Sequence, residues 1–250
     1  MITRQQMEII NRKTLRYPLH IAEKDYLLAL VLQHLAKSPL GEKLVFKGGT
    51  AVHHCYLEQQ RFSEDLDFST GGEAVSLEEI REVLTAAEFL EIRKDYQSDA
   101  TIKIERLLYT GPLGHPNSLK VEIDFKQNVL LPPQHLSYQN VWGVDFPVRV
   151  MDAREICAEK IRAMSERARY RDFYDLYMLL ETRSIELGEV AGYAEQKEMR
   201  QPISKESIRR NWQILAAQKG SEAQQIYLSQ PIDDRQIESL IDEMPFETLT

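Results

Sequence analysis

The sequence predicts an α+β fold over residues 1–150, followed by an all-helical half over residues 151–250. Before residue 150, short apolar or alternating runs that are typical of strands are interleaved with runs at helical spacing. After Asp152, apolar residues recur at helical spacing. A chain of 250 residues can form one large domain or two smaller ones, and this change of pattern predicts a domain boundary near residue 150.

The composition excludes several classes of protein. Hydrophobic residues make up 43% and charged residues 28%, which is too apolar for a disordered chain. No stretch approaches the roughly 20 apolar residues of a membrane helix. The first six residues are polar rather than a secretory signal, and two cysteines cannot build a disulfide framework or a cysteine-based zinc site. We therefore expect a cytoplasmic protein that has no contact with a membrane.

The net charge of −8 arises from 39 acidic and 31 basic residues. This balance argues against nucleic-acid binding through bulk charge. It leaves two arrangements open, namely a local basic groove and an acidic site that binds metal.

In the first third of the chain, helical spacing predicts helices over residues 21–35, 51–57 and 77–89. The Ser38-Pro39 pair ends the first of these helices. Apolar or alternating runs predict strands over residues 44–46 and 65–68. The glycines of Gly48-Gly49-Thr50 predict a tight turn between the first strand and the helix that follows.

In the middle of the chain, β-branched and alternating residues predict strands over residues 100–109, 119–125 and 141–150. Gly111–Pro116 is a predicted turn, and residues 130–133 are a predicted loop. In the second half, predicted helices cover residues 155–168, 170–181, 208–219 and 234–244. Asp152 is the predicted N-cap of the first of them, with Glu155 as its capping-box partner.

The tripeptide Asp65-Leu66-Asp67 is the strongest chemical signal. Residues two apart in a strand point to the same face, so both carboxylates lie side by side. They repel unless a cation lies between them, and Mg²⁺ commonly takes two carboxylates together with substrate phosphates. Asp124, in the similar run Val121–Phe125, is a candidate third metal ligand for a two-metal cluster. The alternative is that these acids form the polar faces of half-exposed strands.

The glycine turn adds a candidate phosphate site. A turn between a strand and a helix leaves backbone N–H groups free at the helix N-terminus, where phosphate is favoured. Gly48 and Gly49 supply those groups, and Thr50 adds a hydroxyl donor. Lys47, just before the glycines, is a candidate phosphate ligand, with a catalytic role or a solvated side chain as the alternatives. A tight turn without a ligand is the alternative, but the unit leads directly to the acidic pair.

These residues resemble a known family. The stretches 45–51 (VFKGGTA) and 61–68 (RFSEDLDF) are similar to the first motif of the AbiEii/AbiGii toxin family, in the nucleotidyltransferase superfamily with the DNA polymerase β fold. Residues 23–26, 159–163 and 171–176 also resemble the family. The resemblance covers about residues 20 to 180. It implies a polymerase β-like core, a mixed sheet flanked by helices, with a helical C-terminal half.

The resemblance also implies residue roles. Gly49 and Thr50 match the pair that contacts nucleotide phosphates, and Asp65 and Asp67 match the metal-binding pair. Lys160 matches the lysine that holds the triphosphate, and Asp172 matches a later acidic motif. Many members act as toxins of bacterial toxin–antitoxin operons, with an antitoxin encoded nearby that need not touch the toxin, and some transfer nucleotides to the acceptor end of tRNA.

The helical half contributes candidate nucleotide-binding cations. If residues 155–176 form one helix, then Lys160, Arg167 and Arg171 lie on one stripe, while Arg162 and Arg169 point elsewhere. Three cations opposite an acidic pair would bind a nucleoside triphosphate. A solvated face with ion pairs is the alternative.

The residues and the resemblance together predict a Mg²⁺-dependent nucleotidyltransferase that moves a nucleoside monophosphate from a nucleoside triphosphate to a hydroxyl group. The resemblance alone implies that this hydroxyl belongs to RNA, with tRNA as the expected acceptor. In this prediction Asp124 helps to deprotonate that hydroxyl, and Lys160 neutralises the triphosphate. Two alternatives stay open. One is an enzyme of the same fold that modifies a small molecule or a protein, and the other is a non-catalytic module that binds nucleotide or RNA.

Overall fold

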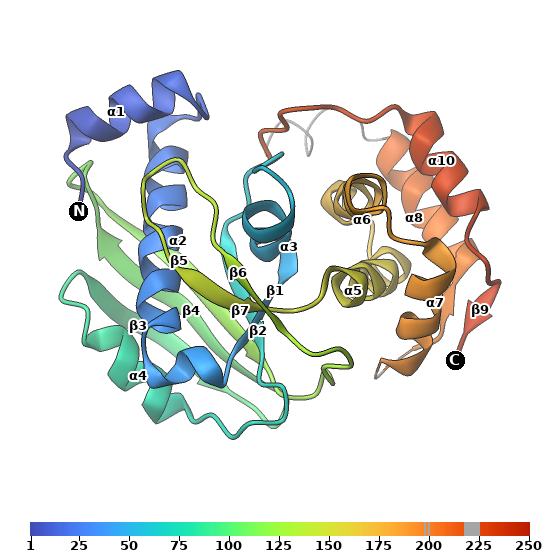
Figure 1. Cartoon of the computed structure of the whole chain (residues 1–250), viewed down its shortest axis with the longest axis horizontal. Helices are drawn as coiled ribbons and strands as arrows, with labels where there is room; N and C mark the ends of the chain where they lie inside the picture. The colour runs from blue at the N-terminus through green and yellow to red at the C-terminus, as the bar shows by residue number, and fades with distance from the viewer. Residues whose placement is uncertain (198, 200, 218–225) are drawn as a thin grey trace.

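A seven-stranded mixed sheet is the centre of the computed structural model, which describes residues 1–197, 199, 201–217 and 226–250. The strand order is β3-β4-β5-β2-β1-β7-β6 (Figure 1). The strands are β1 (Val45–Lys47), β2 (Asp65–Ser69), β3 (Leu90–Gln97), β4 (Thr101–Thr110), β5 (Pro116–Asp124), β6 (Gln134–Ser137) and β7 (Pro147–Val150). Strand β2 pairs antiparallel with β1 and parallel with β5, which makes the sheet mixed.

Several helices accompany the sheet in the first half of the chain. They are α1 (Arg4–Lys13), α2 (Leu19–Ala36), α3 (Gly48–Ala51), which continues as a π-helical turn (Val52–Tyr56), and α4 (Leu77–Thr85). Helix α2 packs on β2, β5 and β7, and α4 packs on β3. The apolar stripe of α2, with Leu27, Leu28 and Leu32 fully buried, supplies much of the core beneath the sheet.

The second half packs as a helical layer beside the sheet (Figure 1). Its helices are α5 (Ala153–Glu166), α6 (Tyr170–Arg183), α7 (Leu187–Gln196), α8 (Lys205–Ala217) and α10 (Asp234–Asp242). Trp212 of α8 packs against Phe173 of α6, with ring centroids 5.3 Å apart. The half is not wholly helical as predicted, because β8 (Ile203–Ser204) and β9 (Thr248–Leu249) form a small antiparallel sheet. No helix in the described ranges is long and apolar enough to span a bilayer.

Several predicted elements differ in extent. The helix predicted over 77–89 ends at Thr85, and the strand predicted over 141–150 forms only over residues 147–150. Strands β3 and β6 were not predicted, because their mainly exposed residues lack an alternating apolar pattern. The predicted end of the helix over 208–219 falls at residues 218 and 219, which lie outside the described residues.

Residues 155–176 do not form one continuous helix, so the condition for a single stripe of cations is not met. Helix α5 ends at Glu166, and Arg167 is extended with φ −153° and ψ 149°. No glycine or proline marks this break in the sequence. The break is stabilised by a contact across it. The Arg167 guanidinium donates to the carboxylate of Asp172 in the first turn of α6, which holds the start of α6 against the end of α5.

The N-terminus of α5 also differs from the prediction. Asp152 caps the helix by accepting from the Arg154 N–H, but Glu155 is not its capping-box partner. The Glu155 carboxylate instead accepts from the backbone N–H groups of Leu130 and Leu131 and pairs with Lys197 at 2.6 Å. Glu155 therefore fixes the loop that precedes β6 to the helical half.

Candidate active site

A cavity of about 240 Å³ opens between the sheet and the first two helices of the second half. Its sheet side is acidic, and its helix side carries several cations. The lining includes the predicted residues Lys47, Gly48, Gly49, Asp65, Asp67, Asp124, Lys160, Arg167, Arg171 and Asp172. The structure thus brings together every predicted site residue except Thr50.

Asp65 and Asp67 lie on β2 with their side chains on the cavity face, while Leu66 and Phe68 anchor the strand in the core. No hydrogen bond or ion pair from the described residues reaches either carboxylate. Burial and the neighbouring charge of Asp65 raise the pKa of Asp67 to about 6. The pKa of Asp65 is also raised, mainly by burial and by Glu64. Two adjacent acids that no direct ion pair from the described residues neutralises favour a bound cation between them.

The strand register decides which acid lies opposite this pair. Strand β5 places Glu122 directly opposite Asp67 and Asp124 opposite Ser69. Asp124 lines the cavity, but its Oδ1 accepts from the backbone N–H groups of Lys126 and Gln127. Within the described part of the chain, no three His, Cys, Asp or Glu side chains are arranged to hold a metal ion. Among the described residues, Asp124 therefore does not complete a preformed three-carboxylate cluster, and Asp65 and Asp67 are the pair that lies side by side on one strand.

Gly48 is required at the end of β1 for two separate reasons. Its φ of +76° lies in the left-handed region that other residues rarely adopt. A Cβ at this position would also lie 2.4 Å from Oδ2 of Asp67. The glycine thus allows the backbone to approach the acidic pair.

We expect Gly48→Ala to reduce activity by at least about tenfold and to destabilise the fold by about 1–3 kcal/mol, because the methyl group displaces Asp67 and strains the backbone. The measurements are turnover and chemical denaturation. Gly114→Ala is the matched control, since Gly114 has the same φ of +76° with nothing within 4 Å of its added Cβ. Equal effects of the two variants on activity would contradict this explanation.

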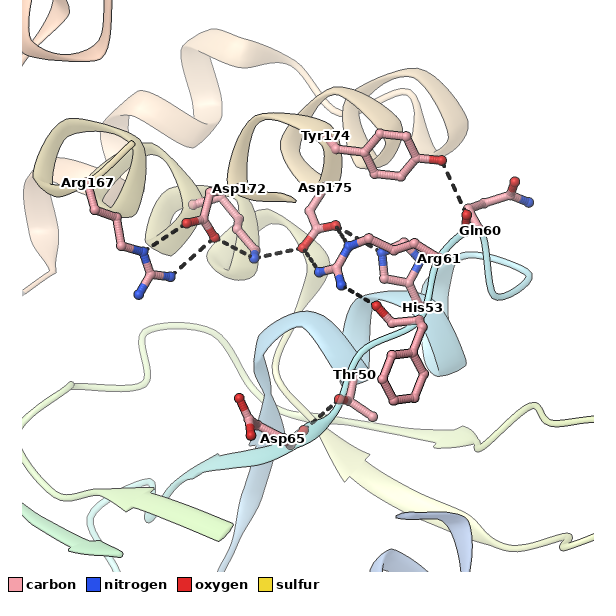
Figure 2. A network of polar contacts seen from close by, with 11 residues as sticks. Thr50, His53, Gln60, Arg61, Asp65, Arg167, Asp172, Tyr174 and Asp175 are labelled. Carbon is pink, nitrogen blue, oxygen red and sulfur yellow. Dashed lines mark hydrogen bonds and ion pairs between the residues drawn. The ribbon is translucent and has the colours of Figure 1, made fainter. Parts of the chain in front are cut away.

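Thr50 does not face the cavity, contrary to its predicted role as a phosphate donor. Its side chain is fully buried, and its hydroxyl donates to the backbone carbonyl of Asp65 at 2.6 Å (Figure 2). A hydroxyl has one hydrogen to donate, so this bond occupies it. Thr50 therefore positions the start of β2 beneath the acidic pair.

Lys47 lies opposite Asp67 in the register of β1 and β2. Its ammonium group pairs with Glu159 of α5 at 3.3 Å, and Lys197 pairs with the same carboxylate at 3.1 Å. Burial raises the pKa of Glu159, but the charges of these two lysines outweigh it and lower the pKa to about 2. Lys47 thus lines the cavity as a nearly buried, paired cation.

Lys160, Asp172 and Arg167 form one connected group on the helix side, and Figure 2 shows Arg167 beside Asp172. The Lys160 ammonium lies 3.0 Å from Asp172 and 2.7 Å from Asp175. Arg167 donates to both oxygens of Asp172 at 2.9 and 3.3 Å. Burial disfavours the charge of Lys160, but the two acids outweigh it and raise its pKa. Asp172 therefore holds two cations at the cavity with its own carboxylate fully buried.

Two further arginines complete the helix side. Arg171, the second residue of α6, lines the cavity and makes no ion pair with a carboxylate of the described residues. Arg162 also lines the cavity, although it was predicted to point elsewhere. The break between α5 and α6 bears on Arg171, which reaches the cavity from a second helix, whereas Arg162 lies on α5 together with Lys160.

Sequence reasoning missed Arg61 and Asp175 as site residues. Arg61 is buried and forms a bidentate pair with Asp175 at 2.8 and 2.7 Å (Figure 2). Asp175 also accepts from His53 at 2.9 Å, and these partners keep its pKa well below its usual range despite burial. Both residues fall within stretches that resemble the family, which is the signal that could have identified them.

His53 is expected to make stability depend on pH. Burial and the charge of Arg61 lower its pKa to about 4, against 6.5 for an ordinary histidine. The unfolded chain therefore binds a proton that the folded chain excludes as the pH falls through 6.5. Between pH 7 and pH 4.5 this residue removes about 2 kcal/mol of unfolding free energy.

His53→Gln should therefore show a shallower dependence in urea denaturation across that range. The exposed His20→Gln is the control and should keep the wild-type slope. A His53→Gln slope equal to wild type would contradict the assignment.

Similar proteins place this geometry in a family. A family model described as nucleotidyl transferase AbiEii toxin, type IV toxin–antitoxin system, matches residues 30–248. A search of curated proteins found no match. The solved structure of MenT4, a nucleotidyltransferase toxin from Mycobacterium tuberculosis H37Rv, has a TM-score of 0.69 and 22% identity, covering 95% of this chain and 89% of that one.

A protein from H. pylori described as a nucleotidyltransferase has a TM-score of 0.57 and 18% identity, covering 91% of this chain and 96% of that one. The two structures show that this chain shares the polymerase β-like nucleotidyltransferase fold. The family model spans most of the chain. The chain therefore belongs to the AbiEii family of nucleotidyltransferase toxins of type IV toxin–antitoxin systems.

Proposed function

We propose that this chain transfers a nucleoside monophosphate from a nucleoside triphosphate to a hydroxyl group of RNA, and that the RNA is tRNA. One observation carries the proposal. Two carboxylates without protein partners face several cations across one cavity. That pattern complements a polyphosphate with a bound cation, because the anionic phosphates meet the cations and the metal meets the acids.

Mg²⁺ fits the acidic side of the cavity. Asp65 and Asp67 would hold it, because the two carboxylates lie side by side on β2 and no ion pair from the described residues reaches either of them. Two carboxylates are too few for a closed protein cage, which suits an ion that also binds substrate phosphates. When bound, the ion would polarise the phosphoryl oxygens and neutralise developing charge.

The helix side would bind the triphosphate and stabilise the leaving pyrophosphate. Lys160 and Arg167 are fixed by Asp172 before substrate arrives, so little side-chain freedom is lost on binding. Arg171 is available for a direct phosphate contact. Gly48 and Gly49 line the opposite side, where the backbone can approach the substrate closely.

The acceptor hydroxyl would enter from the side of β5. Asp124 lines the cavity there and would accept the hydroxyl proton, while its bonds to two backbone N–H groups fix its orientation. As a family toxin, the chain is expected to act with a cognate antitoxin, and we propose that it acts in the cytoplasm, where its substrates lie.

The test is a labelling assay. The purified chain, Mg²⁺ and each α-³²P-labelled nucleoside triphosphate are incubated with total bacterial RNA, beside a sample with EDTA and the Asp65→Ala variant. We expect label in a tRNA-sized band from the wild-type sample with Mg²⁺, and no such label from the EDTA sample or the Asp65→Ala variant. Triphosphate consumption that leaves RNA unlabelled would favour a protein or small-molecule acceptor instead. Binding without consumption of any triphosphate would favour a binding module.

A further inference from the structure

A second cavity of about 350 Å³ adjoins the first. The two cavities share Ser63 and Arg171 in their linings. Phe62, Arg169 and Tyr227 line the second cavity but not the first. A ligand in the second cavity would therefore lie directly beside the nucleotide in the first cavity.

One side of the second cavity is aromatic. The rings of Phe62 and Tyr227 lie 6.4 Å apart, and both pack against Tyr17, at 5.9 and 5.4 Å respectively. The Phe62 N–H donates to the Ile226 carbonyl at 2.9 Å, which fixes the segment that carries Tyr227. The aromatic side is therefore held in place by the fold, as a stacking surface for a base requires.

The other side of the second cavity is basic. Arg169 and Arg171, at the start of α6, both line it. Glu64 also lines it, but its carboxylate is paired with Lys24 at 2.7 Å. The cavity thus offers guanidinium groups and aromatic rings within one space.

We propose that this cavity binds the nucleotide of the acceptor RNA that lies next to the reacting hydroxyl, an inference that rests on the proposed function. The alternative ligand is the nucleoside of the incoming triphosphate. The nucleoside part of the triphosphate is uncharged, because the phosphates attached to it would lie in the first cavity. An uncharged group does not explain the arginines that line the second cavity. A residue of an RNA chain carries one phosphodiester for each base. Arg169 matches the phosphodiester, and the ring of Tyr227, supported by the buried Phe62, matches the base.

The test separates RNA binding from triphosphate binding. Tyr227→Leu keeps apolar volume and removes the ring, and we expect the KM for RNA to rise about tenfold, with the KM for triphosphate within twofold. Tyr227→Phe should stay within twofold of wild type for both. Arg169→Gln should weaken binding of a fluorescein-labelled ten-nucleotide RNA ending in CCA. It should also reduce the slope of log affinity against log salt by about 0.7, the loss of one phosphate contact.

Tyr96→Leu and Arg93→Gln are matched controls, because both residues are exposed on β3, three strands away from β2. Thermal denaturation of each variant checks that it is folded. A higher KM for triphosphate with an unchanged KM for RNA would overturn the inference and assign the cavity to the incoming nucleoside. Unchanged constants in folded variants would also overturn it. If wild type labels no RNA in the first place, the proposed function itself fails, and this inference fails with it.

Discussion

Asp67→Asn is expected to reduce nucleotidyl transfer by about a thousandfold or more while making the folded chain more stable. The amide keeps the shape of the side chain but cannot replace a carboxylate opposite a divalent cation. Activity is therefore lost. Stability rises because the pKa of Asp67, about 6 in the folded chain, shows that its ionised form is disfavoured there.

The size and pH range of the stability gain follow from that pKa. Raising a carboxyl pKa from 3.8 to about 6 destabilises the ionised folded state by about 3 kcal/mol, and solvent in the cavity reduces this to about 1–2 kcal/mol. The penalty is fully present above pH 6 and fades as the pH falls toward 4. We expect the gain in urea denaturation with EDTA at pH 8 and a smaller gain at pH 5.

Glu122→Gln is the matched control for this experiment. Glu122 lies opposite Asp67, but it is paired with Lys103 at 3.0 Å and is half-exposed. Its removal should leave turnover within about tenfold of wild type and should stabilise the chain less than Asp67→Asn does, because its charge contributes only a minor part of the repulsion at Asp67. An Asp67→Asn variant that loses stability, or that keeps wild-type turnover, would contradict the account of the acidic pair.

Asp175→Asn is expected to have the largest effect on stability, a loss of about 3–5 kcal/mol. Asp175 neutralises Arg61 and Lys160, and its carboxylate is fully buried among them. The amide leaves the fully buried guanidinium of Arg61 without its counter-charge. Such a loss is a large share of the 5–15 kcal/mol typical of a folded domain.

An exposed pair of the same chemistry provides the control. Arg81 donates to both oxygens of Asp95 at 2.7 and 3.0 Å, with its side chain 45% exposed. Asp95→Asn should cost no more than about 1 kcal/mol, since solvent replaces the lost contact. Urea denaturation of both variants at pH 7 measures the difference. If Asp175→Asn and Asp95→Asn lost similar unfolding free energies, burial would not be the reason why the pair of Arg61 and Asp175 stabilises the fold.

The sequence predicted the local part of the site well. The run over residues 44–46, the glycine turn and the alternation over 65–68 correctly placed two strands and the acidic pair on one face. These signals are local, because strand periodicity and the freedom of glycine act within a few residues. The resemblance to the family added Lys160 and Asp172, which the structure places at the same cavity.

The parts that sequence could not predict depend on contacts between distant residues. The register that places Glu122, rather than Asp124, opposite Asp67 is set by the pairing of strands whose partner residues are more than fifty positions apart in the sequence. The pair of Arg61 and Asp175 joins positions separated by 114 residues. Thr50 fits a phosphate donor in the sequence, and only the packed fold shows that its hydroxyl already donates to Asp65.

The division of the site between the two halves of the chain has a consequence for protein synthesis. The acids lie on β2, and the cations Lys160, Arg167 and Arg171 belong to α5, α6 and their connection. When only the first 150 residues of the chain have emerged from the ribosome, both acids have been made but these cations have not. The complete site should therefore form only after α6 has left the ribosome and docked, so chains that end before α6 should lack transfer activity.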